Sequence, residues 1–94
     1  QMPYSVHITE ALFLLTEIYF RTENYERSIL TAEKMLELFP ESELTGFALL
    51  RIGKIYEYQE RPEEAVDIYQ TVLKSFADRG IASQAKKSLQ SVQL

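Results

Sequence analysis

Apolar and small residues recur along most of the chain at the three- and four-residue spacing that lines one face of a helix. One such stripe consists of Tyr25, Ser28, Ile29, Ala32, Leu36 and Phe39, and another of Ala65, Ile68, Tyr69, Val72, Leu73 and Phe76. No stretch shows the strict alternation of a half-buried strand. The pattern therefore predicts an all-α protein with helices over residues 5–21, 25–39, 44–59, 62–77 and 81–93.

Glycine and proline mark the ends of these predicted helices. They are Pro3, Pro40, Gly46, Pro62 and Gly80, and only Gly53 falls inside a strongly periodic stretch. Pro62 suits the first turn of a helix, where its missing N–H is no loss, and Asn24 suits the N-cap of the helix that begins at Tyr25. Long helices joined by short turns are the expected arrangement.

The chain contains an internal repeat with a period of 37 residues. Shifting the sequence by this amount pairs 12–39 with 49–76 and gives identities at Leu12/Leu49, Ile18/Ile55, Tyr19/Tyr56, Glu23/Glu60, Glu26/Glu63, Leu36/Leu73 and Phe39/Phe76. Repeat periods of 20–50 residues are typical of solenoids, in which each unit is a small supersecondary element stacked on its neighbour. Each unit here spans two predicted helices.

The two units resemble the tetratricopeptide repeat. The second unit carries the family's signature at Leu49, Ile52, Gly53, Tyr56, Ala65, Tyr69 and Val72. The first carries it as Leu12, Leu15, Thr16, Tyr19, Ser28, Ala32 and Met35, followed by Pro40. Small residues permit close helix crossings, so we expect Gly53 to face Ala65 and Thr16 to face Ser28.

The resemblance implies an α-α superhelix, or solenoid, of two helix hairpins plus a C-terminal capping helix. On this interpretation the chain is a single domain over residues 1–94, with repeat 1 at about 9–42, repeat 2 at about 46–79 and the terminal helix at about 81–93. The last helix has a thin apolar stripe of Ala82, Ala85, Leu89 and Val92 and an otherwise polar surface, which suits an outer face that meets water.

Composition narrows the classes of function. The 94 residues include 10 basic and 14 acidic side chains, a net charge of −4, which does not favour a nucleic acid as partner. No cysteine is present, so neither disulfides nor thiolate metal sites can form. The longest purely aliphatic or aromatic run, 11–15, is far shorter than the roughly 20 residues of a membrane-spanning helix.

Candidate chemistry is sparse. His7 is the only histidine, and we interpret it as a solvated residue near a helix start. An acidic cluster around Glu60, Glu63, Glu64 and Asp67 lacks the glycine and terminal glutamate of a calcium loop. No phosphate-binding glycine loop or nucleophile elbow occurs. We therefore predict that the protein is not an enzyme and has no metal site and no cofactor.

The resemblance also implies a partner-binding groove, because the first helix of each unit lines the concave face in this family. Carrying the groove positions across gives Glu10, Phe13, Leu14, Glu17, Phe20 and Arg21 in the first unit and Phe47, Leu50, Arg51, Lys54, Glu57 and Tyr58 in the second. The residues predicted to bind a partner are eight of these, Phe13, Glu17, Phe20, Phe47, Leu50, Arg51, Lys54 and Tyr58. The last helix would add Lys87 and Ser91. Phe13 and Glu17 stand where family members that bind chaperone tails carry lysine and asparagine, so a terminal-carboxylate clamp is not expected. Instead, Phe13, Phe20, Leu50 and Tyr58 are expected to form one apolar strip edged by charged residues.

An exposed apolar strip on a small domain indicates a partner surface. The leading hypothesis is a non-enzymatic protein–protein interaction module that binds an apolar peptide or helix of another protein in the groove. The alternative is that the chain is a structural segment of a longer repeat array or of a homo-oligomer and acts as a scaffold in a bacterial envelope complex. In that case further repeats, a second copy or residues 1–7 would cover the strip.

The compartment is left open by the sequence. The run Ala82-x-x-Ala85-Lys86-Lys87-x-Leu89 resembles bacterial envelope proteins of the Tol–Pal coordinator and outer-membrane-assembly lipoprotein type. This resemblance implies a periplasmic location, with the cytoplasm as the alternative.

Overall fold

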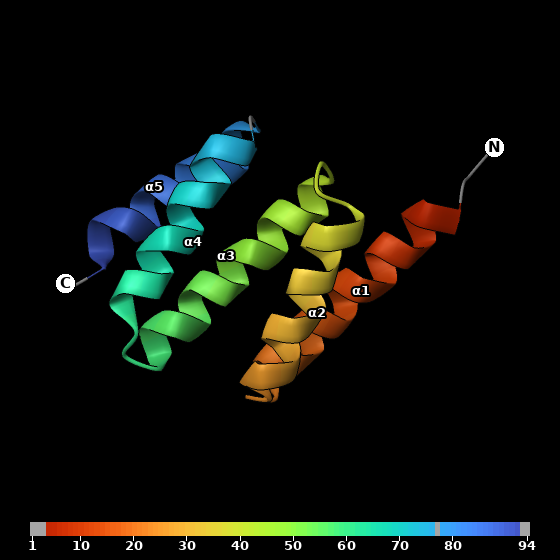
Figure 1. The fold of residues 1–94 in the computed structure, drawn as a ribbon, viewed down its shortest axis with the longest axis horizontal. Helices are drawn as coiled ribbons and strands as arrows, with labels where there is room; N and C mark the ends of the chain where they lie inside the picture. Colours follow the sequence, from red (N-terminus) through yellow and green to blue (C-terminus); the bar gives the residue numbers. More distant parts are fainter. Residues whose placement is uncertain (1–3, 77, 93–94) are drawn as a thin grey trace.

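The computed structural model describes residues 4–76 and 78–92, and side chains from His7 onward. Within these ranges it contains five helices and no strand, joined by short turns (Figure 1). The helices are α1 (Tyr4–Arg21), α2 (Tyr25–Leu38), α3 (Glu43–Tyr58), α4 (Pro62–Ser75) and α5 (Arg79–Ser91). The predicted all-α superhelix of two hairpins with a terminal helix is confirmed.

The two hairpins close with the same turn. Glu23 and Glu60, one repeat period apart, both adopt a left-handed backbone, with φ of 62° and 60°. After each, a backbone N–H donates across the turn over 2.8 Å, from Asn24 to Tyr19 and from Arg61 to Tyr56. The 37-residue repeat seen in the sequence is therefore a repeat of backbone geometry as well.

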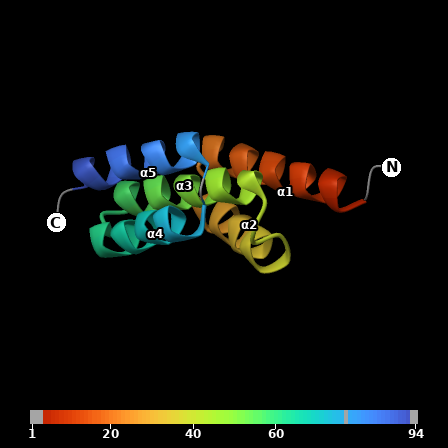
Figure 2. The same ribbon diagram turned by 90° about the horizontal axis from the view of Figure 1, so that it is seen from above.

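The helices form two layers. In Figure 2, α1 and α3, which are the first helices of the two repeat units, lie in one layer with the terminal helix α5. Helices α2 and α4 lie in the other layer. Helix α3 packs against each of the other four helices. It is accordingly the most buried element, with Ala48, Leu49, Ile52 and Ile55 at most 1% exposed. A core of this kind depends on contacts between units, as expected of a stacked repeat.

Each predicted helix start lies within two residues of the start in the structure, and the largest difference is at α5. Asp78 caps this helix by accepting a hydrogen bond from the Ile81 N–H over 3.0 Å, so the helix begins at Arg79 rather than 81. Asn24 occupies the N-cap of α2, but its side chain makes no capping bond. The predicted helix ends at 77 and 93 lie outside the described residues.

The helix crossing inside each hairpin is filled in two different ways. In the first hairpin, Thr16 is wholly buried and faces Ser28, as predicted. The Ser28 hydroxyl donates a hydrogen bond to the Thr16 carbonyl over 2.9 Å. In the second, the ring of Tyr69 contacts Gly53: a Cβ built there would lie 2.3 Å from Tyr69 Cε1. The side chain nearest to Gly53 is therefore that of Tyr69, one helical turn after Ala65, and the facing of Gly53 and Ala65 stays a prediction.

Candidate functional site

A groove of about 390 Å³ runs between α1, α3 and α5, the helices of one layer. Its lining comes from α1 (Phe13, Glu17), α3 (Phe47, Leu50, Arg51, Lys54) and α5 (Gly80, Gln84, Ser88). Six of the eight residues that the resemblance assigned to the partner surface line this groove, all of them on α1 and α3. The structure thus brings most of the predicted site together from positions on α1 and α3 that are 30 to 41 residues apart.

The apolar part of the groove consists of Phe13, Phe47 and Leu50. Phe47 is 40% exposed, whereas Leu50 is only 8% exposed and belongs to the core cluster of buried residues. Phe13 is partly buried and packs against the same core. Phe47 is thus the side chain that offers most apolar surface to a ligand, while Leu50 supports the floor and contributes to folding.

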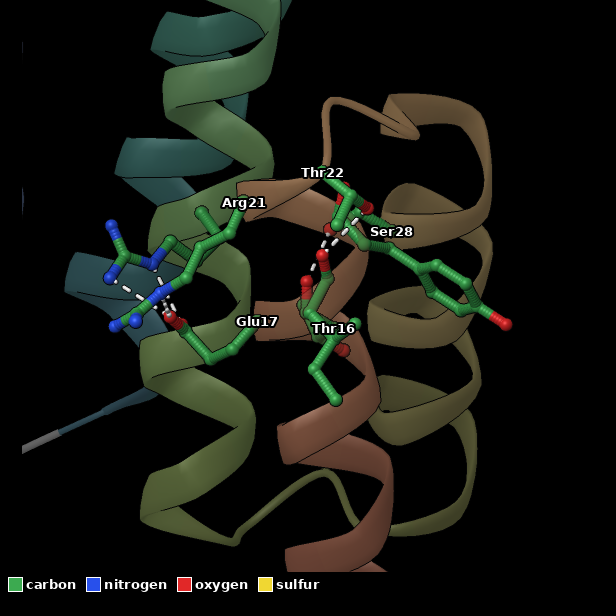
Figure 3. A network of polar contacts seen from close by, with 8 residues as sticks. Thr16, Glu17, Arg21, Thr22 and Ser28 are labelled. Carbon is green, nitrogen blue, oxygen red and sulfur yellow. Dashed lines mark hydrogen bonds and ion pairs between the residues drawn. The ribbon is translucent and has the colours of Figure 1, made fainter.

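The charged residues of the groove are paired with one another. Arg51 on α3 donates two hydrogen bonds to the Glu17 carboxylate on α1, from Nε over 2.7 Å and from Nη2 over 3.0 Å. Arg21 approaches the same carboxylate, with its Nε at 4.0 Å (Figure 3). A two-point pair of this kind fixes both side chains and links the two repeat units. Arg51 is consequently held in place instead of standing free for an anion.

A second pair continues along α3. Lys54 Nζ lies 3.7 Å from the Glu57 carboxylate, which also accepts the hydroxyl hydrogen bond of Tyr69 from α4. Burial, followed by the neighbouring Glu57 carboxylate, raises the pKa of Tyr69 well above its usual value of 10.0. The phenol therefore stays protonated and serves as a structural donor, not as an acid or nucleophile at neutral pH.

Phe20 and Tyr58 lie outside this groove. They join Tyr25 in an aromatic cluster whose ring centroids are each 6.1 Å apart. The guanidinium carbon of Arg51 lies 4.6 Å from the centre of the Phe20 ring, so Arg51 connects the cluster to the groove. The expected single apolar strip is thus two patches: the groove floor, and an aromatic cluster in which Tyr58 is 60% exposed.

The contribution of α5 differs from the expectation. Lys87 and Ser91 were expected in the groove, but Gln84 and Ser88 line it. The repeat explains the difference, since Gln84 and Ser88 are 37 residues after Phe47 and Arg51. A flanking helix can present only the side that faces α3, and for α5 this is the side equivalent to Phe47 and Arg51. The period alone could not identify them, since Lys87 and Ser91 are likewise 37 residues after the groove residues Leu50 and Lys54.

Further features of the described residues bear on the chemistry. A more open hollow of about 420 Å³ at the α2–α3 connection contains Glu10 of the groove positions carried across, and none of the eight predicted partner-binding residues. No group of three or more histidine and acidic side chains in the described ranges is arranged to hold a metal ion. None of the helices described is long and apolar enough to cross a membrane.

Comparison with known proteins identifies the family. The family model described as tetratricopeptide repeat matches residues 7–78, which covers both hairpins and the start of the turn to α5. Searches of curated proteins and of solved structures found no match. Members of this family generally mediate protein–protein interactions and are generally not catalytic. Together with the duplicated hairpin and its shared turn, the match shows that the chain belongs to the tetratricopeptide repeat family.

Proposed function

We propose that the groove between α1, α3 and α5 binds an apolar segment of another protein and that the chain acts as a non-enzymatic interaction module. One observation supports this most directly: Phe47 is 40% exposed on a buried helix and points into a groove whose charged rim is already neutralised. An exposed aromatic side chain in a concave site, surrounded by fixed polar groups, is typical of a binding anchor.

The electrostatics favour an internal apolar segment over a free chain terminus. Arg51 is committed to Glu17 by two hydrogen bonds, and Lys54 lies beside Glu57. A terminal carboxylate would have to break one of these pairs and leave its acidic partner uncompensated, which costs free energy. The ligand we propose is therefore a peptide or helix that inserts apolar side chains between Phe13 and Phe47.

The test uses peptides selected against the 94-residue chain from a displayed random library. Synthetic peptides should bind with the same Kd whether they end in a carboxylate or an amide, measured by calorimetry. Phe47→Asp should weaken binding by at least about tenfold, since a charge then replaces an apolar anchor. Leu30→Asp is the matched control, because Leu30 is 60% exposed on α2 in the other layer.

Two results would contradict the proposal. One is full affinity in the Phe47→Asp variant while circular dichroism shows an intact fold. The other is binding that depends on a free carboxylate and is lost on Lys54→Ala, which would show that the groove reads a chain terminus. Leu50→Asp is unsuitable for this test because Leu50 is only 8% exposed, and loss of binding would then follow from unfolding.

The bacterial envelope location has less support. It depends on one short run in α5, of which Ala85 is buried in the core and Lys86 and Lys87 are exposed. Alternating buried and exposed residues of this kind are what any capping helix requires, so the run carries little information about the compartment. The periplasmic location and the scaffold role remain predictions.

A further inference from the structure

The outer side of α1 is a continuous apolar surface. Ile8, Leu14, Leu15 and Ile18 are between 40% and 59% exposed, and Ala11 between them is exposed as well. At 100° per residue these five side chains occupy one arc of the helix. We call them the α1 outer face. At this spacing Ile8, Ala11 and Leu15 lie on the side of α1 away from the groove residues Phe13 and Glu17. Leu14 and Ile18, at one edge of the face, line a separate hollow with these two groove residues.

The repeat shows that the same face is made for burial. Thr45, Ala48, Ile52 and Ile55 of α3 are equivalent, one period later, to Ile8, Ala11, Leu15 and Ile18, and they are at most 1% exposed. In α3 this side packs against the hairpin of α1 and α2. In α1 no described helix covers it, because α1 contacts only α2 and α3 among the described helices and the five side chains stay exposed.

The opposite end of the molecule does not match this face. The exposed side of α5 carries Lys86, Lys87 and Gln90, together with Arg79, Ser83 and Gln84. Stacking α1 of one copy onto α5 of the next would press an apolar surface against a cationic one and desolvate unpaired charges. Head-to-tail assembly of identical chains is therefore unfavourable, and a twofold assembly that pairs like surfaces is the alternative that the charges permit.

The spacing of the α1 outer face suits pairing with itself. Ile8, Ala11, Leu15 and Ile18 are separated by three, four and three residues, the spacing of a coiled-coil seam. In an antiparallel pair, Ile8 of one copy faces Ile18 of the other and Ala11 faces Leu15. These pairs place the twofold axis at the level of residue 13, so Leu14 lies one residue from the axis and close to its own counterpart.

We propose that two copies of this chain associate through α1, antiparallel about a twofold axis near Leu14. A single helix pair gives an interface at or below about 1,200 Å² in total, the low end of specific complexes. The dimer is accordingly weak, with a dissociation constant in the micromolar range. It uses residues of α1 that do not line the groove, so it does not depend on the proposed function.

Sedimentation equilibrium of the 94-residue chain over about 1–300 µM tests the proposal. The mass should rise with concentration from 10.9 kDa toward twice that value. Ile18→Glu should raise the dissociation constant by more than about tenfold, because each interface then buries two unpaired carboxylates. Leu30→Glu, an identical kind of change at a 60% exposed leucine on α2, should leave it unchanged.

Crosslinking tests the geometry independently. Since the chain has no cysteine, Leu14→Cys introduces a single thiol, which should form an intermolecular disulfide under mild oxidation. Leu30→Cys should not. A chain that stays monomeric at 300 µM would overturn the proposal and assign the face to a different protein. A dimer that survives Ile18→Glu, or that Leu30→Glu dissociates, would overturn it by placing the interface elsewhere.

Discussion

Replacing Gly53 with alanine tests the packing between α3 and α4. In a solvent-exposed helix this change stabilises by about 1 kcal/mol, because alanine loses less backbone entropy on folding. Here the new Cβ would lie 2.3, 2.5 and 2.9 Å from Cε1, Cζ and the hydroxyl oxygen of Tyr69. Ordinary carbon contacts begin at about 3.5 Å, so the ring would have to move by more than about 1 Å.

The ring has little freedom to move. Tyr69 is wholly buried, and its hydroxyl donates to the Glu57 carboxylate. Overpacking of a tight core costs about 1–3 kcal/mol, and a contact this short belongs at the upper end. After the helix-propensity gain of about 1 kcal/mol, the net loss for Gly53→Ala is about 2 kcal/mol. In a domain of this size that lowers Tm by about 8–16 °C.

Thermal melts followed by circular dichroism measure the effect, with Gly46→Ala as the matched control. A Cβ at Gly46, on the same helix, would meet its nearest neighbour at 3.0 Å and needs only a small adjustment. The sharper test is Tyr69→Leu, which removes all three clashing atoms. In that background Gly53→Ala should become stabilising. If Gly53→Ala is neutral in the parent, or equally costly in both backgrounds, the contact with Tyr69 does not limit the packing.

Three further outcomes are expected. Glu60→Gly should raise stability by about 0.5–1 kcal/mol in a urea melt, since Glu60 has a left-handed backbone that glycine adopts without steric cost; lower stability would contradict this. Tyr69 keeps its proton in the folded state above pH 10, where the unfolded chain releases it, so stability should fall as pH rises beyond 10 and Tyr69→Phe should reduce that slope. In a double-mutant cycle, Glu17→Ala and Arg51→Ala should show a coupling of about 1–2 kcal/mol, and additive losses would mean that the pair adds nothing.

The architecture was predictable because it depends on local patterns. Apolar periodicity predicted four helix starts to within one residue. The repeat paired Glu23 with Glu60, but their shared left-handed backbone emerged only from the structure. The start of α5 was predicted two residues late. Its signal was present, since Asp78 stands three residues before Ile81, the spacing of a side-chain cap. That cap precedes a weakly apolar helix, so periodicity alone did not reveal it.

The composition of the groove was predictable only in part. Carrying family positions across identified Phe13, Glu17, Phe47, Leu50, Arg51 and Lys54, because equivalent positions in a repeat lie on equivalent helix faces. It did not reveal that Arg51 is bound to Glu17, nor that Arg51 lies over Phe20. These contacts depend on rotamers of long side chains between elements that are distant in sequence. They determine which charges remain available, and hence what kind of ligand the groove can accept.

The α1 outer face shows why a repeat signature cannot by itself distinguish core from surface. Leu15 and Ile52 hold the same signature position, yet Leu15 is 40% exposed and Ile52 is 1% exposed. The difference lies in the neighbours, because α3 contacts all four of the other described helices, whereas α1 contacts only α2 and α3 among them. The signature therefore specifies which helix faces are apolar, and the number of neighbouring helices decides which of these faces are buried and which stay exposed. Since none of the five residues of the α1 outer face lines the groove, the two proposals do not exclude each other: we expect one chain to bind a ligand and associate with its copy at the same time.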